Sequence, residues 1–426
     1  MRILIKNGHV VDPANKRDTV ANVYISDGKI AAIGNTLAGF TADQEIDAGG
    51  KLVCPGLVDL SARLREPGYE HKATIASETR AAALSGITTL ACPPDTDPVI
   101  DTPAVIKLIR QRSERAGYSN VHCIGAASRD LEGELLSEMG ALKEAGCVGI
   151  SNAMIPIKNP LIMKRIMEYA ATFDLTIFLF AEDPSLRNSG CMHEGAISTR
   201  LGLPGISEAA ETVAVARDLA LIADTGVRAH FCRISTAKAA QMIARAQYDG
   251  LAVTADVSAH QLYLTDMDVG EFDSQCHVRP PLRSQRDMQG LREAVRKGSI
   301  SAICSDHQPH ENDAKLNPFR ESASGISALE TLLPLTLRLV DECRISLSEA
   351  IARVTVEPAR ILGINAGTLS VGSAADLIVV DAEQYWSLSK ETMLSRGRNT
   401  PFFGWELKGR VTQTLINGQL VYNATE

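Results

Sequence analysis

Short runs of alternating apolar and polar residues mark both ends of the chain. Ile5 to Val11 reads Ile-Lys-Asn-Gly-His-Val-Val, and Leu415 to Val421 reads Leu-Ile-Asn-Gly-Gln-Leu-Val. An Asn-Gly pair between such runs supplies the positive φ angles of a type I′ hairpin turn. Other strand-like runs are Asn22 to Ile25, Ile30 to Ile33, Asp376 to Asp381 and Val411 to Leu415. We therefore expect a small β-sandwich domain built from both termini, residues 1–54 and 356–426.

Residues 55–355 show a different pattern, in which short apolar runs alternate with amphipathic stretches. Apolar residues recur at three-to-four spacing in Pro103 to Gln111 and Glu208 to Ala223, which predicts helices. The apolar runs predict eight strands: Leu57 to Ser61, Thr88 to Cys92, Val121 to Gly125, Cys147 to Ser151, Thr176 to Ala181, Val227 to Cys232, Ala252 to Val257 and Ser301 to Ser305.

Eight strand–helix units in this length favour an α/β fold, a closed TIM (β/α)8 barrel. A doubly wound open sheet is the alternative. In a barrel the chemistry belongs at the carboxyl ends of the strands. The candidate residues therefore lie at or just beyond the end of each apolar run.

Composition and charge narrow the classes of function. The chain has 426 residues, and 43 basic against 51 acidic side chains give a formal charge of -8. This charge argues against a general nucleic-acid binder, although a local basic pocket remains compatible with it. No apolar run approaches the roughly 20 residues that cross a bilayer, and the N-terminus has no apolar leader core, so we expect a cytoplasmic protein without membrane contact. The nine cysteines stand singly without a CxxC pair, which favours buried, reduced thiols.

Several ordered motifs give the chain a resemblance to a known family. They include Val58-Asp59-Leu60 before Arg65-Glu66-Pro67-Gly68, Ala181-Glu182-Asp183, His193-Glu194-Gly195, Arg279-Pro280-Pro281-Leu282-Arg283 and Ser305-Asp306-His307-Gln308-Pro309-His310. Together they resemble the amidohydrolase superfamily and, within it, the dihydroorotases of the bacterial long-chain type. The resemblance covers nearly the whole chain and implies a TIM barrel beside a small β domain.

The resemblance also implies a reaction and a metal site. Dihydroorotases close carbamoyl aspartate reversibly to dihydroorotate, and zinc polarises the carbonyl and acidifies the attacking water. Six positions hold zinc in the family: two His after strand 1, an Asp or carboxylated Lys after strand 4, a His after each of strands 5 and 6, and an Asp after strand 8. In this chain the corresponding residues are Ser61, Arg63, Asn152, Phe180, Arg233 and Asp306.

Only Asp306 among these six is a good zinc ligand. An arginine stays protonated and repels a dication, a phenylalanine has no lone pair, and a serine is a weak ligand. A catalytic zinc site needs about three protein ligands. We therefore expect no metal and no other cofactor. We also expect that Arg63 or Arg233 pairs with the buried Asp306, and that Phe180 fills space that an imidazole occupies in the family.

The substrate-binding positions give a mixed result. By resemblance, Arg65 and His310 are retained, whereas the two asparagines of the family have become Asp95 and Arg279. An aspartate beside Arg65 would pair with it and repel an incoming carboxylate. We therefore expect weakened binding of dihydroorotate.

Three functions follow from these residues. The favoured one is a noncatalytic pseudoenzyme that resembles the dihydroorotase-like subunit of bacterial aspartate carbamoyltransferase. That subunit joins the catalytic chains in a hetero-oligomer, expected to be a dodecamer of six and six, and we also expect self-association. The second is a metal-independent or mononuclear amidohydrolase of cyclic amides, with Asp306 and His310 as acid and base and Arg65 or Arg279 as electrophile. The third is an anion-binding regulator lined by Arg63, Arg65, Arg233 and Arg279.

Aromatic residues in the segment from Gln384 to Trp405 suggest where a partner could dock. The segment contains Tyr385, Trp386, Phe402, Phe403 and Trp405, in a chain with only 4% aromatic residues. Such residues are typical of interface hot spots. They could equally cover the seam between the barrel and the small domain.

Overall fold

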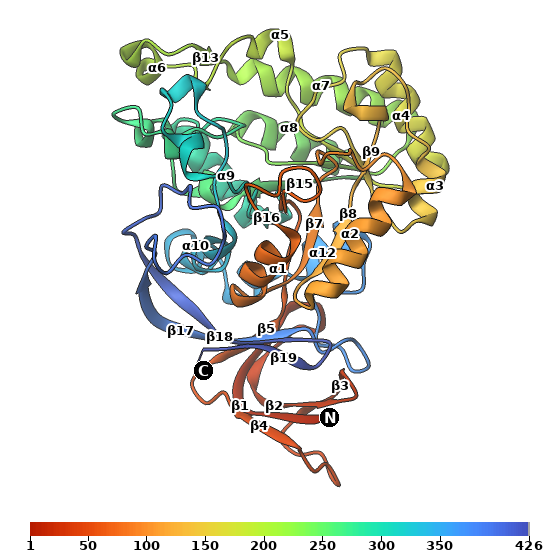
Figure 1. Ribbon diagram of the computed structural model, residues 1–426, viewed down its shortest axis with the longest axis vertical. Helices are drawn as coiled ribbons and strands as arrows, with labels where there is room; N and C mark the ends of the chain where they lie inside the picture. The colour runs from red at the N-terminus through yellow and green to blue at the C-terminus, as the bar shows by residue number, and fades with distance from the viewer. Residues whose placement is uncertain (425–426) are drawn as a thin grey trace.

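Both chain ends build one eight-stranded sheet in the computed structural model, which describes residues 1–424. The strands follow the order β19-β18-β17-β5-β1-β2-β3, and β4 pairs with β1. They are β1 (Arg2–Asp12), β2 (Arg17–Ser26), β3 (Lys29–Gly34), β4 (Gln44–Asp47), β5 (Leu52–Pro55), β17 (Leu377–Ser387), β18 (Glu406–Ile416) and β19 (Gln419–Asn423). Figure 1 shows this sheet as a folded layer below the barrel. Its two halves enclose an apolar cluster that includes Ile5, Val23, Val53, Leu377 and Leu415.

One of the two predicted Asn-Gly hairpins is present and the other is wrong. Asn417 and Gly418 have φ angles of 50° and 70° and connect β18 to β19. Asn7 and Gly8, by contrast, lie inside β1, where the pairing with β2 shifts register. A Cβ at Gly8 would lie 2.4 Å from Cγ2 of Val53. This glycine therefore permits the close approach of β5 and does not form a turn.

The middle of the chain forms the predicted TIM barrel. Its strands are β6 (Leu57–Asp59), β7 (Ile87–Cys92), β8 (Asn120–Cys123) continued by β9 (Gly125–Ala126), β10 (Ile150–Ser151), β11 (Ile177–Leu179), β14 (Ala229–Phe231), β15 (Val253–Ser258) and β16 (Ala302–Cys304). The paired neighbours among them are parallel. All eight predicted strands are present, although several are shorter than their apolar runs. The open-sheet alternative is therefore rejected.

The barrel closes between β6 and β16 through the residues beyond them. The His307 amide donates to the Ser61 carbonyl over 3.0 Å, and the Arg63 amide donates to the His307 carbonyl over 2.9 Å. Nearer the start of β6, the Val58 amide donates to the Val354 carbonyl over 2.9 Å. Closure at the carboxyl ends thus brings the loops after the first and the last strand into direct contact.

Helices surround the barrel on its outside. They are α1 (Ile75–Leu84), α2 (Pro103–Ala116), α3 (Met139–Glu144), α4 (Pro160–Thr172), α5 (Pro184–Arg187), α6 (Ala196–Leu201), α7 (Glu208–Thr225), α8 (Ala237–Tyr248), α9 (Gln285–Lys297), α10 (Leu329–Cys343), α11 (Leu347–Ala352) and α12 (Val356–Leu362). A two-stranded ribbon, β12 (Met192–His193) with β13 (Gly205–Ile206), lies between α5 and α7 in the chain. Both predicted helices are present, as α2 and α7.

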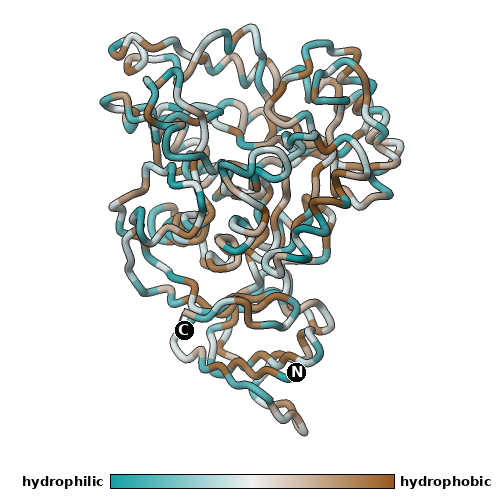
Figure 2. Tube along the Cα trace, viewed as in Figure 1, coloured by the Kyte–Doolittle hydropathy of each residue, from teal (hydrophilic) through white to brown (hydrophobic). Residues whose placement is uncertain are grey.

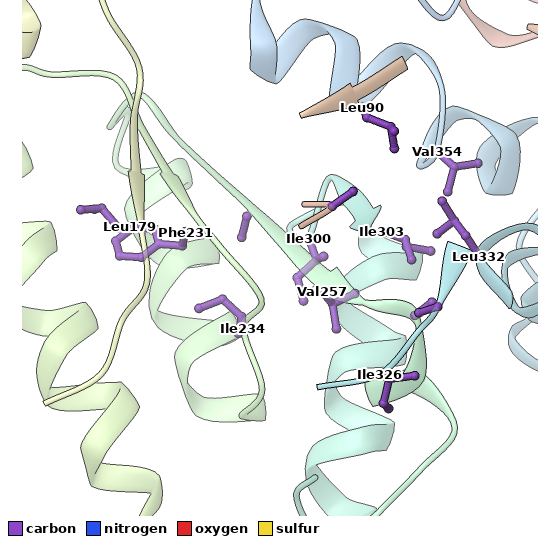
Figure 3. Packing of buried hydrophobic residues seen from close by; sticks show 14 of the residues in the cluster. Leu90, Leu179, Phe231, Ile234, Val257, Ile300, Ile303, Ile326, Leu332 and Val354 are labelled. Atoms are coloured by element: carbon purple, nitrogen blue, oxygen red, sulfur yellow. The ribbon is translucent and has the colours of Figure 1, made fainter. Parts of the chain in front are cut away.

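Apolar side chains pack on both sides of the barrel wall. Figure 3 shows Leu179 beside Phe231, and Val257 beside Ile300, within the cluster that joins strands to outer helices. A second cluster contains residues that alternate with these along the strands and so face the other side of the barrel wall. It includes Val58 and Phe178, together with residues of α12. Residues 356–426, which the sequence assigns to the small domain, therefore begin with a helix that packs on the barrel strands β6 and β16.

Hydropathy follows this layering along the chain. Figure 2 shows hydrophobic residues gathered along the strands and hydrophilic ones along many connecting loops. Cys232 and Cys343 are half-buried, and the other seven cysteines are buried. No helix within residues 1–424 is both long and apolar enough to cross a bilayer.

The hairpin turn at Asn417-Gly418 provides a test of the small domain. Gly418 has a positive φ, and a Cβ there would lie 2.7 Å from the Cα of Gly28. We expect Gly418→Ala to destabilise the protein by more than about 1 kcal/mol, because both strain and a clash are introduced. Gly34→Ala is the matched control, since a Cβ at Gly34 meets nothing within 4 Å. Urea unfolding of both variants checks this, and equal midpoints for the two would contradict it.

Candidate functional site

Six side chains at the barrel mouth correspond to the zinc positions of the resembled family. Ser61 and Arg63 follow β6, Asn152 follows β10, Phe180 follows β11, Arg233 follows β14 and Asp306 follows β16. Because the strands are parallel, their carboxyl ends share one face of the barrel. Arg233 and Asp306 have φ angles of 54° and 49°, so the chain turns sharply where it leaves these two strands.

The Asp306 carboxylate lies at the centre of the mouth and is 1% exposed. Its Oδ1 atom lies 3.4 Å from Arg63 Nη1 and 3.5 Å from Arg233 Nε. The side chains of Ser61 and Gln308 also donate to Oδ1, over 3.5 and 3.2 Å. The predicted pairing of Asp306 with a guanidinium group is confirmed, and it involves both arginines.

The charges of this cluster depend on one another. Burial raises the pKa of Asp306, and the positive charges of Arg233 and Arg63 act against this rise. Burial lowers the pKa of Arg233, but the negative charges around it, led by Asp306 and including Asp256, together raise that pKa above its ordinary value. The two guanidinium groups thus supply the positive charge that a buried carboxylate needs.

Arg233 is fixed from several directions. Its Nη1 donates to Ser61 Oγ over 2.9 Å, and its backbone N–H donates to Asp256 Oδ1 over 2.5 Å. Asp256 in turn contacts His230 Nε2 over 2.9 Å inside the barrel. This histidine, three residues before the family's ligand position, therefore supports the strand end and does not point into the mouth.

Asp95 pairs with Arg63, which corrects the expected pair with Arg65. Arg63 Nε donates to Asp95 Oδ2 over 2.7 Å. Burial would raise the pKa of Asp95, but the charge and hydrogen bond of Arg63, together with the charge of Arg65, lower it. Arg65 instead donates from Nε to the Pro309 carbonyl over 3.0 Å, and its Nη2 lies 3.1 Å from His310 Nε2.

Phe180 lies between two guanidinium groups. The guanidinium carbons of Arg233 and Arg279 are each 5.2 Å from its ring centroid, which is the distance of a cation–π contact. Arg279 also binds Glu182 with two hydrogen bonds, of 2.5 and 3.1 Å. Glu182 is 4% exposed, and Arg187 approaches it within 3.6 Å. The sequence reasoning did not assign Glu182 to the site, although its place just beyond a strand end is a signal that could have done so.

Asn152 does not reach Asp306. Its Nδ2 donates to the carbonyls of Leu131 and Ile155 over 3.0 and 2.9 Å, and its Oδ1 accepts from Ser128 Oγ over 2.7 Å. These bonds connect the loops after β9 and β10. The residue therefore holds loop backbone in place.

The six positions do not fit a zinc ion. Two guanidinium groups lie within 3.5 Å of the only carboxylate among them, in the space that a dication bound to this carboxylate would need. Their charge repels a metal, and neither group offers a lone pair. No step that requires zinc can be derived from this set of donors.

A group of potential metal ligands inside the barrel is already hydrogen-bonded. The atoms of His230, Cys232 and Asp256 that could bind a metal ion lie within 4.8 Å of one another. However, His230 Nδ1 lies 2.8 Å from Thr254 Oγ1 and its Nε2 lies 2.9 Å from Asp256 Oδ2. Burial also raises the pKa of the Cys232 thiol, which disfavours the thiolate that metals bind. These contacts make the three residues part of the hydrogen-bonded interior of the barrel.

A second group is formed by His193, Glu208 and Asp287, of which only Glu208 is partly exposed. His193 Nδ1 faces Arg283 Nη1 at 3.4 Å, and Glu208 forms an ion pair with Arg286. Asp287 accepts from Ser284 Oγ and from the Ala237 amide, so the ligand atoms of this group also have partners within the protein.

The expected acid–base pair of Asp306 and His310 is not formed. Asp306 contacts Ser61, Gln308 and the two arginines, whereas His310 lies between Arg65 and Lys72. Burial, and then the charges of Arg65 and Lys72, lower the pKa of His310 to about 2. This imidazole is therefore neutral near pH 7 and belongs to a separate network.

The aromatic residues of the segment 384–405 cover a seam. Trp386 Nε1 donates to the Gly409 carbonyl over 3.1 Å, and Phe402 is buried edge-on against Trp405. Arg338 of α10 stacks over Trp405 at 5.7 Å. Of the five aromatic residues, only Tyr385 is largely exposed. The segment therefore joins the β17–β18 arm to the barrel.

Comparisons with known proteins agree with this architecture. A family model described as dihydro-orotase-like matches residues 50–239, and an amidohydrolase family model matches residues 313–422. The chain is 49% identical over 422 residues to a dihydroorotase-like protein of Pseudomonas putida, covering 99% of each chain. It is 44% identical over 427 residues to a dihydroorotase of Syntrophotalea carbinolica, covering 100% of both. The relatives thus include proteins with both names.

A solved structure shows the same fold. The L-hydantoinase (dihydropyrimidinase) from Arthrobacter aurescens superposes with a TM-score of 0.88 at 25% identity, covering 100% of this chain and 96% of that one. A dihydropyrimidinase from Brevibacillus agri gives a TM-score of 0.85 at 21% identity.

Loss of one guanidinium group from the Asp306 cluster should destabilise the chain. We expect Arg233→Met to lower the free energy of unfolding by about 3 kcal/mol or more, because a buried carboxylate loses one of its cations. Arg245→Met is the matched control, since Arg245 is exposed, pairs with Asp249 and lies over the exposed Tyr248 ring, and it should cost less than about 1 kcal/mol. Urea unfolding measures both changes. Similar losses in the two variants would show that the mouth cluster is not under electrostatic constraint.

His260 should link stability to pH. Burial, and then repulsion by Arg233, lower its pKa to about 3. The unfolded chain binds a proton here near pH 6.5 and the folded chain does not, so stability is present above that pH and falls below it by about 1.4 kcal/mol per unit. Between about pH 7 and pH 5 we expect the wild type to lose about 2 kcal/mol more than His260→Asn, measured by urea unfolding. Parallel losses in both proteins would refute this.

Proposed function

This chain belongs to the dihydroorotase-like family of the amidohydrolase superfamily, and we propose that it is a noncatalytic member of that family. In this proposal it acts as a structural assembly subunit of aspartate carbamoyltransferase in pyrimidine biosynthesis. Its partner is the catalytic chain of that enzyme, in a hetero-oligomer of six and six. The fold is retained because another protein docks on it.

The observation that carries the proposal is the Asp306 cluster. Hydrolysis or closure of a cyclic amide needs a group that activates water and a group that polarises the carbonyl. At this mouth the carboxylate that could bind a metal is held by Arg63 and Arg233 at 3.4 and 3.5 Å. Both guanidinium groups and the side chains of Ser61 and Gln308 face the same oxygen, Oδ1, so this oxygen is not free to hold a metal ion or a water.

The substrate positions support the same proposal. Asp95 is ionised beside Arg63 and repels an incoming carboxylate. Arg279 is held by Glu182, so its guanidinium group is already neutralised. His310 has a pKa of about 2 and cannot act as an acid near neutral pH. Each of the substrate contacts expected from the family is therefore altered or occupied, except that of Arg65.

Metal content and turnover test the loss of catalysis. We expect the purified chain to contain much less than one zinc per chain and to show no hydrolysis of dihydroorotate above background. Stoichiometric zinc with dihydroorotate turnover would overturn the proposal. Turnover of dihydroorotate or hydantoin that survives exhaustive chelation would instead favour a metal-independent amidohydrolase.

Co-expression tests the assembly role. We expect the chain to co-elute in size-exclusion chromatography with the aspartate carbamoyltransferase catalytic chain encoded in the same genome, and sedimentation should give equal numbers of both. Separate elution at micromolar concentrations would contradict an assembly role. Heat released in calorimetry with carbamoyl aspartate or orotate, without any co-elution, would favour an anion-binding regulator.

A further inference from the structure

A cavity of about 370 Å³ lies in the seam between the β17–β18 arm and the barrel. Its walls come from the end of α1, the first half of α10, the strands β17, β18 and β19, and the segment after β17. Figure 1 shows β17 and β18 extending from the small-domain sheet toward α10. Most lining residues are apolar or aromatic, and they include Leu84, Leu333, Pro334, Trp386, Val411 and Tyr422. A largely apolar hollow of this size at a domain boundary is typical of a small-molecule site.

Glu330 places a buried carboxyl group in the wall of this cavity. The residue is 7% exposed, and its Oε1 accepts from the amides of Leu394 and Ser395 over 2.7 and 2.8 Å. Its Oε2 is buried and has no hydrogen-bond partner within residues 1–424. A buried carboxylate oxygen without a partner costs free energy, because water solvates it in the unfolded chain. The wall therefore contains a strong acceptor that the described part of the chain does not use.

The turn of α10 that carries Glu330 has more acceptors than donors. Glu330, Leu333 and Pro334 are three and four residues apart, so they share one face of the helix, and all three line the cavity. Pro334 has no N–H, so the Glu330 carbonyl does not receive the hydrogen bond that the residue four positions later usually donates. The nearby Ser387 hydroxyl is directed elsewhere, since it donates to the Trp405 carbonyl over 3.3 Å.

The electrostatics of the wall also favour a cation beside Glu330. Burial, and to a smaller extent the charge of Glu78, raise the pKa of Glu330 to about 7, although two backbone hydrogen bonds act against this rise. A positive charge next to the carboxyl group would favour its ionised form. Arg410 is the only cationic residue in the lining, and its side chain is exposed on β18 and forms no ion pair within residues 1–424.

We propose that this cavity binds a small organic cation, whose ammonium group pairs with the Glu330 carboxylate and whose apolar or aromatic body fills the space beside Trp386. Aromatic rings attract ammonium ions, so Trp386 and Tyr422 in the wall favour the same charge as Glu330 does. The inference goes beyond the proposed function, because it assigns a ligand site away from the barrel mouth and does not depend on the carbamoyltransferase.

Other occupants match the wall less well. An anion would face Glu330 and, behind it, Glu78, whose charges repel it. A metal ion needs several oxygen ligands, and Glu330 is the only carboxylate among the lining residues. Water alone could donate to Glu330 but would leave apolar walls in contact with solvent. The exposed Arg410 opposes a second positive charge, so the ligand that fits is a monocation.

Three small molecules with the same ring test the charge of the ligand. Phenethylamine carries an ammonium group, 2-phenylethanol is its neutral analogue and phenylacetate is an anion. In calorimetry at about pH 8, where Glu330 is ionised, we expect phenethylamine to bind with a Kd of about 1 mM or tighter, and 2-phenylethanol about tenfold more weakly. Phenylacetate should release no heat of binding. Equal affinity for the amine and the alcohol, or no binding of the amine at about 10 mM, would overturn the proposal.

A substitution at Glu330 tests the acceptor. Glu330→Gln should weaken phenethylamine binding about tenfold or more and leave 2-phenylethanol binding unchanged, because only the charge is removed. The amide oxygen can still accept from Leu394 and Ser395, and circular dichroism with thermal unfolding verifies the fold. Glu138→Gln is the matched control, since Glu138 is exposed and pairs with Arg129, and it should bind phenethylamine like the wild type. Unchanged amine affinity in a folded Glu330→Gln variant contradicts the inference.

A second pair of variants does not alter the buried carboxyl group. Ser387 lines the cavity on the exposed part of β17. Ser387→Lys adds a competing ammonium group and should weaken phenethylamine binding about tenfold or more, whereas Ser387→Met adds a side chain of similar length without charge and should weaken it less. Equal affinities in these two variants would show that the cavity does not select a cation.

Discussion

The placement of one buried carboxylate between two guanidinium groups governs the barrel mouth. Asp306 follows β16 and Arg63 follows β6, the two strands between which the barrel closes. Closure is made by backbone hydrogen bonds of Ser61, Arg63 and His307, the neighbours of these charged groups. A charge without a partner at this point would therefore weaken the seam as well as the site. Arg233 adds a third strand to the same cluster, so one interaction joins β6, β14 and β16.

Much of the fold could be predicted because the segments that become buried are visible as apolar runs in the sequence. Each barrel strand is an apolar run with both faces covered, and such runs are recognisable without knowing their neighbours. The Asn7-Gly8 pair was misread because a turn and a bulge use the same residues. What distinguishes them is the approach of Val53 from a strand more than forty residues later. The residues around Asn7 and Gly8 in the sequence do not indicate that contact.

The site was predictable in its positions and less so in its pairings. Charge balance alone required a cation near Asp306, and Arg63 and Arg233 supply it. The sequence does not determine whether Asp95 pairs with Arg63 or with Arg65, because that depends on how two loops are placed. In the structure Asp95 pairs with Arg63. Arg65 therefore donates to the Pro309 carbonyl and faces His310, while the charge of Asp95 acts on it without a direct ion pair. The position of Glu182 just beyond β11 marks it as a site residue, but its pairing with Arg279 on a distant loop is not indicated by any sequence spacing.

The same electrostatics explain why a metal site would not return through single substitutions. A histidine in place of Arg63 would add a ligand, but Arg233 would still repel a dication from Asp306, and Asp95 would lose its partner. A histidine in place of Arg233 would leave Arg63 in position, again at 3.4 Å from the carboxylate. Each single step therefore removes a stabilising charge before any metal can bind, and breaking one member of a buried ion cluster costs several kcal/mol. The mouth is therefore held in its present form by the mutual dependence of its charges.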